Sequence, residues 1–476
     1  MVVQHNMQAA NANRMLNVTT GQQAKSTEKL SSGYRINRAA DDAAGLSISE
    51  KMRKQIRGLD KASSNAEDGV SSVQTAEGAL TEVHSMLQRM NELATQSANG
   101  TNSTTDRSAI QDEISQLTTE IDRVAETTKF NETYLLKGGD GTKLEYMKGH
   151  DAGLKGTLTD GTTTATFKVA AGALDEGKSV TIGGKDYTIG SAVADVQDAV
   201  DKLTAADDKV TVNDKTYTYV AANSNAPGGQ TVTTAGWVLD GDKTSTTGTK
   251  LTIANGDKVT TTPKTGASAS YTAAEMDNGV SKADPSIISA EKAVSLMKDE
   301  LIAANKVGVT NGTVEITGNP AYDKDNGVTF NINKGSAEVA NKLSFSLHVG
   351  SDADMTNKIT VGIETMNSSY LGIKGLNVND DSGIAGTYAI DAISDALQKV
   401  SDQRSSLGAV QNRLEHTIDN LDNVVENTTS AESRIRDTDM AKEMVNYSKN
   451  NILAQAGQSM LAQANQSNQG VLSLLQ

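Results

Sequence analysis

The chain repeats apolar side chains every seven residues near both of its ends, and this repeat limits its fold more than any other feature. In the first part, Val73, Leu80 and Leu87 recur at the spacing of a coiled-coil seam, and a second stripe begins at Ile110 and Ile114. In the last part, the stripe is Ile393, Val400, Leu407, Leu414 and Leu421. A helix cannot bury such a stripe alone, so we expect the two ends of the chain to pack together as a helical rod. The residues expected in this assembly seam are Val73, Leu80, Leu87, Ile110, Ile114, Leu407, Leu414 and Leu421.

The middle of the chain has the opposite character, because it holds all four prolines, at positions 227, 263, 285 and 320. Alternating apolar and polar residues predict two β-hairpins, over residues 179–189 and 210–220. The expected turns are Gly183-Gly184 and Asn213-Asp214, and helices are expected over residues 192–203 and 286–305. The predicted fold class is therefore mixed: a long α-helical coiled-coil rod made from both termini, with an inserted β-rich region of one or two small α+β domains.

The composition excludes several classes of function. Asp and Glu (59) outnumber Lys and Arg (44), and the resulting net charge of −15 has the wrong sign for a nucleic-acid partner. No cysteine is present, which excludes disulfides, thiolate catalysis and thiolate metal sites. The five histidines lack the spacing of a zinc-protease helix, and the acidic loops at residues 323–327 and 352–354 lack the glutamate of a hand-type calcium loop. We therefore expect no enzyme activity, no metal and no cofactor.

Neither end of the chain has the properties of a membrane segment or a secretory signal. No run of 18 apolar residues occurs, so no membrane span is expected. Residues 1–7 lack the basic start and the apolar stretch of a cleavable signal peptide. The last 27 residues, from Asn450 onward, contain no charged side chain. This pattern suits a surface that is buried against other copies of the chain, and we expect it to be disordered in a free monomer.

Five segments at the two ends resemble the terminal signatures of bacterial flagellins. They are residues 30–49, which begin Leu-Ser-Ser-Gly-Tyr-Arg-Ile-Asn-Arg, and residues 87–99, 404–414, 433–439 and 471–475. The resemblance covers about the first 137 and the last 135 residues in order. The middle has no such match, as is typical of the variable outer region of this family. The resemblance implies a structural subunit that polymerises helically into the flagellar filament for motility, through head-to-tail contacts that do not close a ring.

The resemblance also implies three domains and a location. Residues 1–43 and 437–476 would form an inner terminal helical domain, the filament core. Residues 44–150 and 342–436 would form a helical rod domain with a short β part, and residues 151–341 the variable outer region. Strands near residues 343–350 and 358–363 would pair where the chain rejoins the rod, close to Asn341. The protein would be secreted without a cleaved signal peptide and would reside in the extracellular filament.

The partners that the resemblance implies are further copies of the chain, a flagellar export chaperone, filament cap and hook-junction proteins, and a host Toll-like receptor. Neither nucleic acid nor a membrane is among them. The receptor contact carries over to Arg89, Leu93 and Glu113. We expect Arg89 to project away from the seam and Leu93 to lie on the flank of the seam. The tail residues expected to form an apolar seam of the inner tube, and to be sensed by intracellular immune receptors, are Val471, Leu472, Leu474 and Leu475.

Two alternatives stay open at this point. A hook–filament junction protein shares weaker versions of both termini, but the tail at residues 471–475 and the block at residues 404–414 favour the filament subunit. In the other alternative, the middle of a filament subunit acts as an adhesin or glycan binder. Neither Trp237 nor the tyrosines of the predicted hairpins decide between these possibilities.

Overall fold

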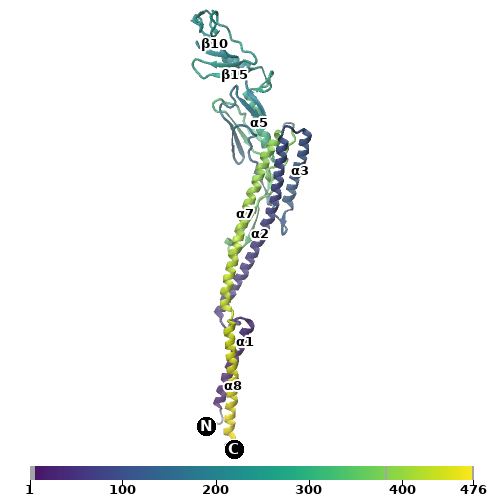
Figure 1. Ribbon diagram of the computed structural model, residues 1–476, viewed down its shortest axis with the longest axis vertical. Helices are drawn as coiled ribbons and strands as arrows, with labels where there is room; N and C mark the ends of the chain where they lie inside the picture. Colours follow the sequence, from purple (N-terminus) through teal and green to yellow (C-terminus); the bar gives the residue numbers. More distant parts are fainter. Residues whose placement is uncertain (1–5, 381–382, 474–476) are drawn as a thin grey trace. The chain divides into compact units, whose positions relative to one another are not determined.

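The computed structural model of the chain, which describes residues 6–380 and 383–473, divides into two compact units. The terminal unit consists of Met1–Gln74, Phe345–Val361 and Leu407–Gln476, and the central unit consists of Thr75–Ser344 and Gly362–Ser406. The boundary crosses two long helices, α2 (Ala43–Ala98) and α7 (Ile384–Arg436). Figure 1 shows long helices from both ends of the chain and strands from its middle, which confirms the predicted mixed fold class. The predicted division into three domains stays a prediction.

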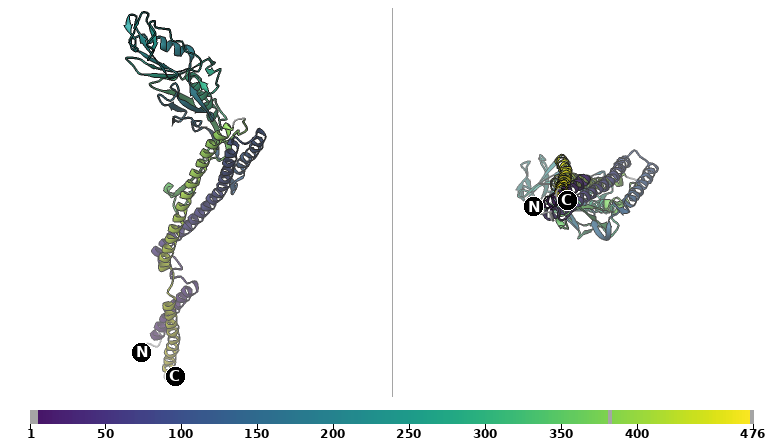
Figure 2. Two further views of the ribbon diagram at one scale, coloured as in Figure 1. Left: turned by 45° about the horizontal axis from the view of Figure 1, so that its top comes forward. Right: turned by 90° about the horizontal axis from the view of Figure 1, so that it is seen from below.

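In the terminal unit, the first and last helices of the described chain lie side by side (Figures 1 and 2). They are α1 (Met7–Ser32) and α8 (Met440–Ser473). Asn6 caps α1, because its side-chain oxygen accepts a hydrogen bond of 2.9 Å from a backbone N–H of the first turn. The side-chain amide of Asn6 also donates to the carbonyl of Ala464 in α8, at 3.1 Å. Gly33, with φ of 77°, ends α1 in the left-handed conformation that glycine adopts without steric cost.

The same unit contains the N-terminal part of α2 and the C-terminal part of α7, which run antiparallel. The hydroxyl of Ser49 donates a hydrogen bond to Glu432, and that of Ser63 donates one to Asp422. Residue numbers therefore rise along one helix where they fall along the other. The predicted strand pair is confirmed as a hairpin of β22 (Leu343–His348) and β23 (Lys358–Ile363), joined through the short 3-10 helix Met355–Asn357. A Cβ atom on Gly69 would lie 2.2 Å from the Leu347 side chain, so the hairpin packs closely on α2 at a residue without a side chain.

In the central unit, α3 (Thr104–Thr127) joins the remaining parts of α2 and α7. A capping box begins α3: the Ser103 hydroxyl and the Asp106 carboxylate bond to each other's backbone N–H groups. Ile110 and Ile114 of α3 are buried, as are Leu80 and Leu87 of α2. The predicted stripes are therefore inside the helical part of this unit.

Short strands connect the helical part of the central unit to the inserted region. Strands β1 (Lys129–Phe130) and β2 (Thr133–Tyr134) form one pair, and α6 (Ser368–Leu371) precedes α7. Strand β3 (Gly139–Tyr146) pairs antiparallel with β21 (Ser336–Asn341). Because β21 begins at Ser336, the returning chain pairs with the first part of the rod earlier than the predicted return near Asn341.

The inserted region contains two small α+β parts, and the first surrounds α5 (Ala290–Asn305). Its four-stranded sheet has the order β19 (Glu315–Thr317), β20 (Val328–Asn333), β5 (Thr164–Val169) and β4 (Thr157–Asp160). Its five-stranded sheet has the order β16 (Met276–Asp277), β17 (Val280–Ser281), β18 (Ile287–Ile288), β7 (Lys185–Ile189) and β6 (Ser179–Ile182). Phe167, Phe330 and Leu301 fill its core. The hairpin predicted over residues 179–189 is β6–β7, and the helix predicted from residue 286 begins at Ala290.

The second part packs α4 (Val193–Asp201) on a six-stranded sheet. The strand order is β13 (Gly236–Leu239), β10 (Lys215–Val220), β9 (Lys209–Val212), β14 (Lys258–Thr262), β15 (Ala269–Ala274) and β8 (Ser191–Ala192). A small pair, β11 (Ser224–Asn225) and β12 (Thr231–Val232), lies apart from this sheet. The predicted hairpin over residues 210–220 is confirmed as β9–β10, with both turn residues at positive φ. Trp237 is 5% exposed and meets Tyr219 edge to face, so it belongs to the core and offers no surface to a glycan.

Candidate assembly and receptor-binding surfaces

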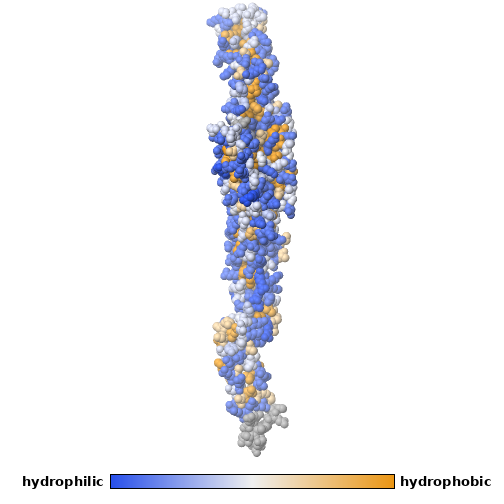
Figure 3. Space-filling model, turned by 90° about the vertical axis from the view of Figure 1, so that its right-hand side faces the viewer, coloured by the Kyte–Doolittle hydropathy of each residue, from blue (hydrophilic) through white to orange (hydrophobic). Residues whose placement is uncertain are grey.

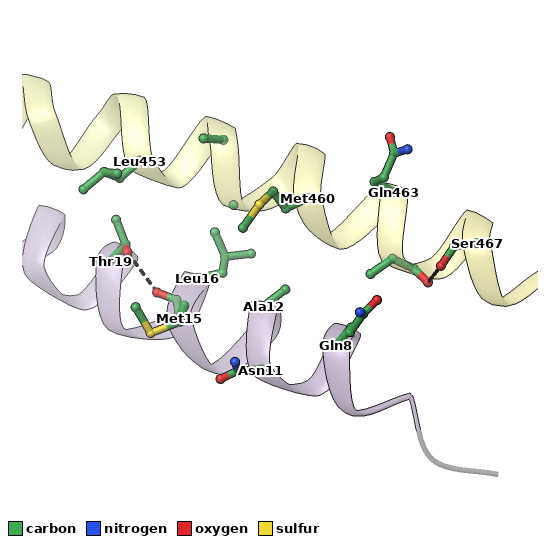
Figure 4. Close-up of a pocket in the computed structure, with 13 residues that line it drawn as sticks. Gln8, Asn11, Ala12, Met15, Leu16, Thr19, Leu453, Met460, Gln463 and Ser467 are labelled. Atoms are coloured by element: carbon green, nitrogen blue, oxygen red, sulfur yellow. Dashed lines mark hydrogen bonds between the residues drawn. The ribbon is translucent and has the colours of Figure 1, made fainter. Parts of the chain in front are cut away.

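A groove of about 610 Å³ lies between α1 and α8. In Figure 4, Met15 and Leu16 of α1 lie across from Leu453 and Met460 of α8. All side chains that line the groove are uncharged; they are Gln8, Asn11, Ala12, Met15, Leu16, Thr19, Leu453, Ala456, Gly457, Met460, Gln463, Ala464 and Ser467. An apolar segment can therefore enter the groove without removing water from a charged group, which would be costly.

Large apolar side chains on this helical pair stay exposed in the single chain. Met460 is 64% exposed, Met15 is 57% exposed and Leu453 is 47% exposed. Other exposed apolar residues on α1 and α8 are Met7, Val18, Met440, Met444, Val445 and Ile452. Figure 3 shows hydrophobic residues among hydrophilic ones on the surface of these helices, near the bottom of the view. Apolar surface that a single chain leaves uncovered marks an interaction site.

The tail residues named from the sequence fall at the limit of the described chain. Leu474 and Leu475 lie outside the described residues. Val471 and Leu472 lie within α8, where the structure describes the backbone and not their side chains. Their predicted part in an inner tube and in recognition by intracellular immune receptors stays a prediction.

The residues of the predicted assembly seam are buried within the single chain. Leu80, Leu87, Leu407 and Leu414 are each 0% exposed. The other members, Val73, Ile110, Ile114 and Leu421, are buried as well. These side chains hold the helices of one subunit together and present no surface to a second copy. Their part in assembly, which stays a prediction, would therefore act through the fold of the subunit.

Two of the three predicted receptor residues meet on an exposed surface of the central unit. The Arg89 Nε atom on α2 lies 2.9 Å from the Glu113 Oε1 atom on α3, and both side chains are about half exposed. Arg89 also pairs with Glu92 at 3.1 Å. Its hydrogen bonds to Glu113 and then to Glu92 raise the pKa of the Arg89 guanidinium, so it stays charged. The pair presents a cation and an anion side by side to any partner at this face.

The third residue, Leu93, is not on that surface. It is 2% exposed, so its predicted place on the flank of the seam does not bring its side chain to the surface. Met90, Ala94 and Ser97 are buried too, and the buried arc of α2 is therefore wider than the two positions per heptad of a simple coiled coil. A partner that binds the folded chain can therefore reach Arg89 and Glu113 but not the side chain of Leu93.

A polar cluster that no sequence pattern predicted joins the two helical pairs of the terminal unit, α1–α8 and α2–α7. The Tyr34 ring lies 5.6 Å from the Arg53 guanidinium and 4.8 Å from that of Arg436, which places it in reach of two cation–π contacts. Arg53 donates to the Tyr34 hydroxyl at 3.2 Å, and this hydrogen bond raises the pKa of Arg53. Glu432 pairs with Arg53 at 3.2 Å and accepts a hydrogen bond from Ser49 at 2.8 Å. The cluster therefore links the connector between α1 and α2, residues 33–42, to both α2 and α7.

Neither a metal centre nor a membrane span emerges from the parts of the chain that the structure describes. Within residues 6–380 and 383–473, no group of three or more histidine, aspartate or glutamate side chains is placed to hold a metal ion. No helix in these ranges combines the length and the apolar character that crossing a bilayer requires.

Comparison with known proteins matches both ends of the chain to one family. Residues 3–140 match the bacterial flagellin N-terminal helical region, and residues 390–475 match the bacterial flagellin C-terminal helical region. These matches contain the terminal helices, the seam residues and the pair of Arg89 and Glu113.

Full-length relatives extend the similarity through the middle. A flagellin of Clostridium tyrobutyricum is 41% identical to this chain, over 98% of the chain and 100% of the relative. Flagellins of Halalkalibacterium halodurans and Bacillus subtilis are each 34% identical, over 100% of this chain and 100% of each relative. At such identity over the whole length, the chain belongs to the bacterial flagellin family.

Proposed function

We propose that this flagellin enters the flagellar filament through the groove between α1 and α8. As a flagellin, the chain is a structural subunit of that filament and not an enzyme. The observation that carries the proposal is the set of exposed, uncharged apolar side chains on the two helices, which a single chain leaves uncovered. Helices of neighbouring copies offer the same kind of apolar surface. Their contact would bury it at a gain of roughly 25 cal/mol per Å² of apolar area.

Polymerisation of purified protein tests the proposal. Filaments should appear in electron micrographs after ammonium sulfate is added to the full chain, and a chain that ends at residue 439 should form none. Brief trypsin treatment should cut monomers at sites such as Arg14 and Lys449, and filaments should resist the same treatment, if the helices are ordered by their neighbours. Filaments formed equally well by the shortened chain would show that the groove is not needed.

We also propose the further partners of a filament subunit: a flagellar export chaperone, the filament cap and hook-junction proteins. Secretion without a cleaved signal peptide belongs to the same proposal. Mass spectrometry of the protein from sheared filaments provides the test. The mature chain should begin within its first residues, whereas loss of a segment of about 15–30 residues would indicate a cleaved signal.

We further propose that a host Toll-like receptor binds the monomer. What supports it is the exposed pair of Arg89 and Glu113, which comes from two helices and sits over the buried Leu93. Arginine is enriched among hot-spot residues, the few residues that supply most of the binding free energy of a protein interface. The contact is therefore proposed for Arg89 and Glu113, with Leu93 as a support for α2.

A further inference from the structure

The α2–α7 pair of the terminal unit carries a row of carboxylates along α7. Glu415, Asp419, Asp422 and Glu426 are all exposed and follow one another at intervals of four, three and four residues. Residues at such intervals lie above one another on one face of a helix. They do not share the face of Leu414 and Leu421, which are both buried. Leu414 packs in one cluster with Ala66 of α2 and Ile359 of β23.

Helix α2 adds two carboxylates to the same side. Asp60 and Glu67 are exposed and share a face with Ser63, at intervals of three and four residues. The Ser63 hydroxyl donates to the Asp422 carboxylate at 3.1 Å, so the rows of α2 and α7 lie beside each other. We call this surface the acidic flank; its members are Asp60, Glu67, Glu415, Asp419, Asp422 and Glu426.

The other side of the pair carries cations. Lys51, Lys54 and Lys61 are exposed and recur in one row with Gly58 and Asn65 of α2. That row faces the hairpin β22–β23, because the Asn65 amide donates to the His348 carbonyl at 3.0 Å and Gly58 packs against Ser351. It therefore points away from the face of Ser63.

Arg413 extends this second surface onto α7. It is two residues before Glu415, which is about 200° around the helix, so the two side chains point to opposite sides. Arg413 also borders a shallow hollow lined by His416, Thr417, Asn420 and Leu421. We call this surface the basic flank; its members are Lys51, Lys54, Lys61 and Arg413. Three exposed carboxylates lie on this side as well: Asp68, which follows Asn65 in the same row of α2, and Asp352 and Asp354 of the hairpin. The four cations outnumber these three carboxylates.

Neither flank is neutralised within the subunit. Over the described residues, none of the six carboxylates and none of the four cations takes part in an ion pair. Like charges in such rows repel one another, and an external surface of opposite sign relieves the repulsion. A second copy of this chain carries that surface.

We propose that the acidic flank of one copy docks against the basic flank of the next copy in the filament. The inference rests on the proposed function and adds a lateral contact between subunits to the groove of α1 and α8. The two flanks lie on opposite sides of one helical pair. When two copies dock, one copy therefore keeps a free basic flank and the other keeps a free acidic flank. Further copies can add to both, so the contact propagates and does not stop at a dimer. Each exposed ion pair between two copies contributes little free energy by itself. The complementary rows of charge would instead set the register of the two copies and the rate at which subunits add to the filament.

Charge reversal on each flank tests the proposal. The first variant carries Glu415→Lys, Asp419→Lys and Glu426→Lys, which spare the bond between Ser63 and Asp422. The second carries Lys51→Glu, Lys54→Glu and Lys61→Glu. Growth on filament fragments is measured by light scattering at low ionic strength. Each variant alone should grow at least tenfold more slowly than the wild type, and one chain that carries all six changes should grow within about twofold of it.

Three controls make the outcome specific. Asp299→Lys, Glu315→Lys and Asp325→Lys change the net charge as the first variant does, on exposed sites of the inserted region, and should leave growth unchanged. About 0.5 M sodium chloride should slow the wild type and reduce its advantage over both variants, since salt screens exposed charges. Circular dichroism and melting temperature confirm that each variant is folded.

Two results would overturn the flank contact while wild-type filaments still form. One is growth of both single-flank variants at the wild-type rate. The other is a folded six-change chain that grows no better than either variant, because complementarity would then not be the cause. If the wild-type chain itself forms no filaments under any condition, the proposed function fails, and the flank contact fails with it.

Discussion

Two helical pairs of the terminal unit use apolar side chains in opposite ways. In the α2–α7 pair, Leu407 and Leu414 are fully buried within one chain. In the α1–α8 pair, Leu453 and Met460 are about half exposed or more. Both pairs consist of long helices drawn from the two ends of the sequence, so helix content and apolar content do not distinguish them. What distinguishes them is whether a single chain can cover its own apolar surface.

Charge separates the pairs in the same way. The α1–α8 groove is lined by uncharged residues only, whereas the α2–α7 pair carries charged flanks around a closed apolar seam. A closed seam with a charged exterior is stable in water. An open apolar groove without charge gains most from association. The α2–α7 pair therefore acts as a finished structural element, and the α1–α8 pair acts as one half of an interface.

The largest expected effect comes from a charge placed in the groove. Met460→Asp should abolish filament formation, because a carboxylate buried between copies without a partner is costly. The melting temperature of the monomer should stay unchanged, since Met460 is exposed there. Electron microscopy and sedimentation measure the first effect and calorimetry measures the second. Leu239→Asp, at a partly exposed leucine of the inserted region, is the matched control and should polymerise normally.

The same substitution made in both pairs separates them by stability. Leu414→Ala should lower the free energy of unfolding by about 2–5 kcal/mol, because it removes buried atoms and leaves a cavity. Leu453→Ala should change that free energy by no more than about 0.5 kcal/mol, as is usual for an exposed site. Urea denaturation of the two monomers makes the comparison. Equal losses of stability would mean that the two pairs do not differ as described.

A smaller effect is expected at the surface pair of the central unit. Arg89→Ala should weaken binding of the monomer to the receptor ectodomain about fivefold or more, as central interface arginines do. The fold should be unaffected, since the side chain is exposed. Arg123→Ala, which removes another exposed arginine paired with a glutamate on α3, is the control and should bind as the wild type does. Normal binding by a folded Arg89→Ala chain would remove this site from the proposal.

The smallest effect is expected in the connector between the two helical pairs. The Asp41 carboxylate accepts hydrogen bonds from the backbone N–H groups of Arg38 and Asn37, and these lower its pKa below 3.8. A lowered pKa means that the carboxylate stabilises the connector fully above about pH 3.8 and that this contribution is lost as the pH falls through the lower value. Asp41→Ala should therefore reduce the melting temperature slightly at pH 7, and this deficit should shrink as the pH falls below 3.8. A deficit that stays constant as the pH is lowered would contradict this account.

Local patterns in the sequence predicted much of the fold. The hairpin turns at Gly183-Gly184 and Asn213-Asp214 were predictable because few residues adopt positive φ, and all four residues have it. The heptad stripes identified the helices that bury Leu80, Leu407 and Leu414. The end of α1 at Gly33 lies within the segment that resembles flagellins, and its left-handed φ gives a physical reason for glycine at that position.

Features that depend on distant parts of the chain were missed. The heptad pattern of α2 left Leu93 on the flank, but a pattern for two helices does not include the additional burial where α3 joins them. The contact of Tyr34 with Arg436 joins residues that are 402 positions apart in the sequence (436 − 34), and the ion pair of Arg53 with Glu432 joins residues 379 positions apart (432 − 53). Only tertiary packing brings such residues together, so no local pattern predicts these contacts. The acidic and basic flanks became visible only when the bond between Ser63 and Asp422 placed two helices side by side.

The pairing of α1 with α8 has a consequence for quality control during assembly. The two walls of the groove come from the opposite extremes of the described chain, so they exist together only in a chain that has been synthesised through α8. A product truncated in the inserted region or in α7 would carry α1 alone and could not present the groove. Only complete chains would then be incorporated at the growing tip of the filament, and no separate factor would be needed to reject truncated chains.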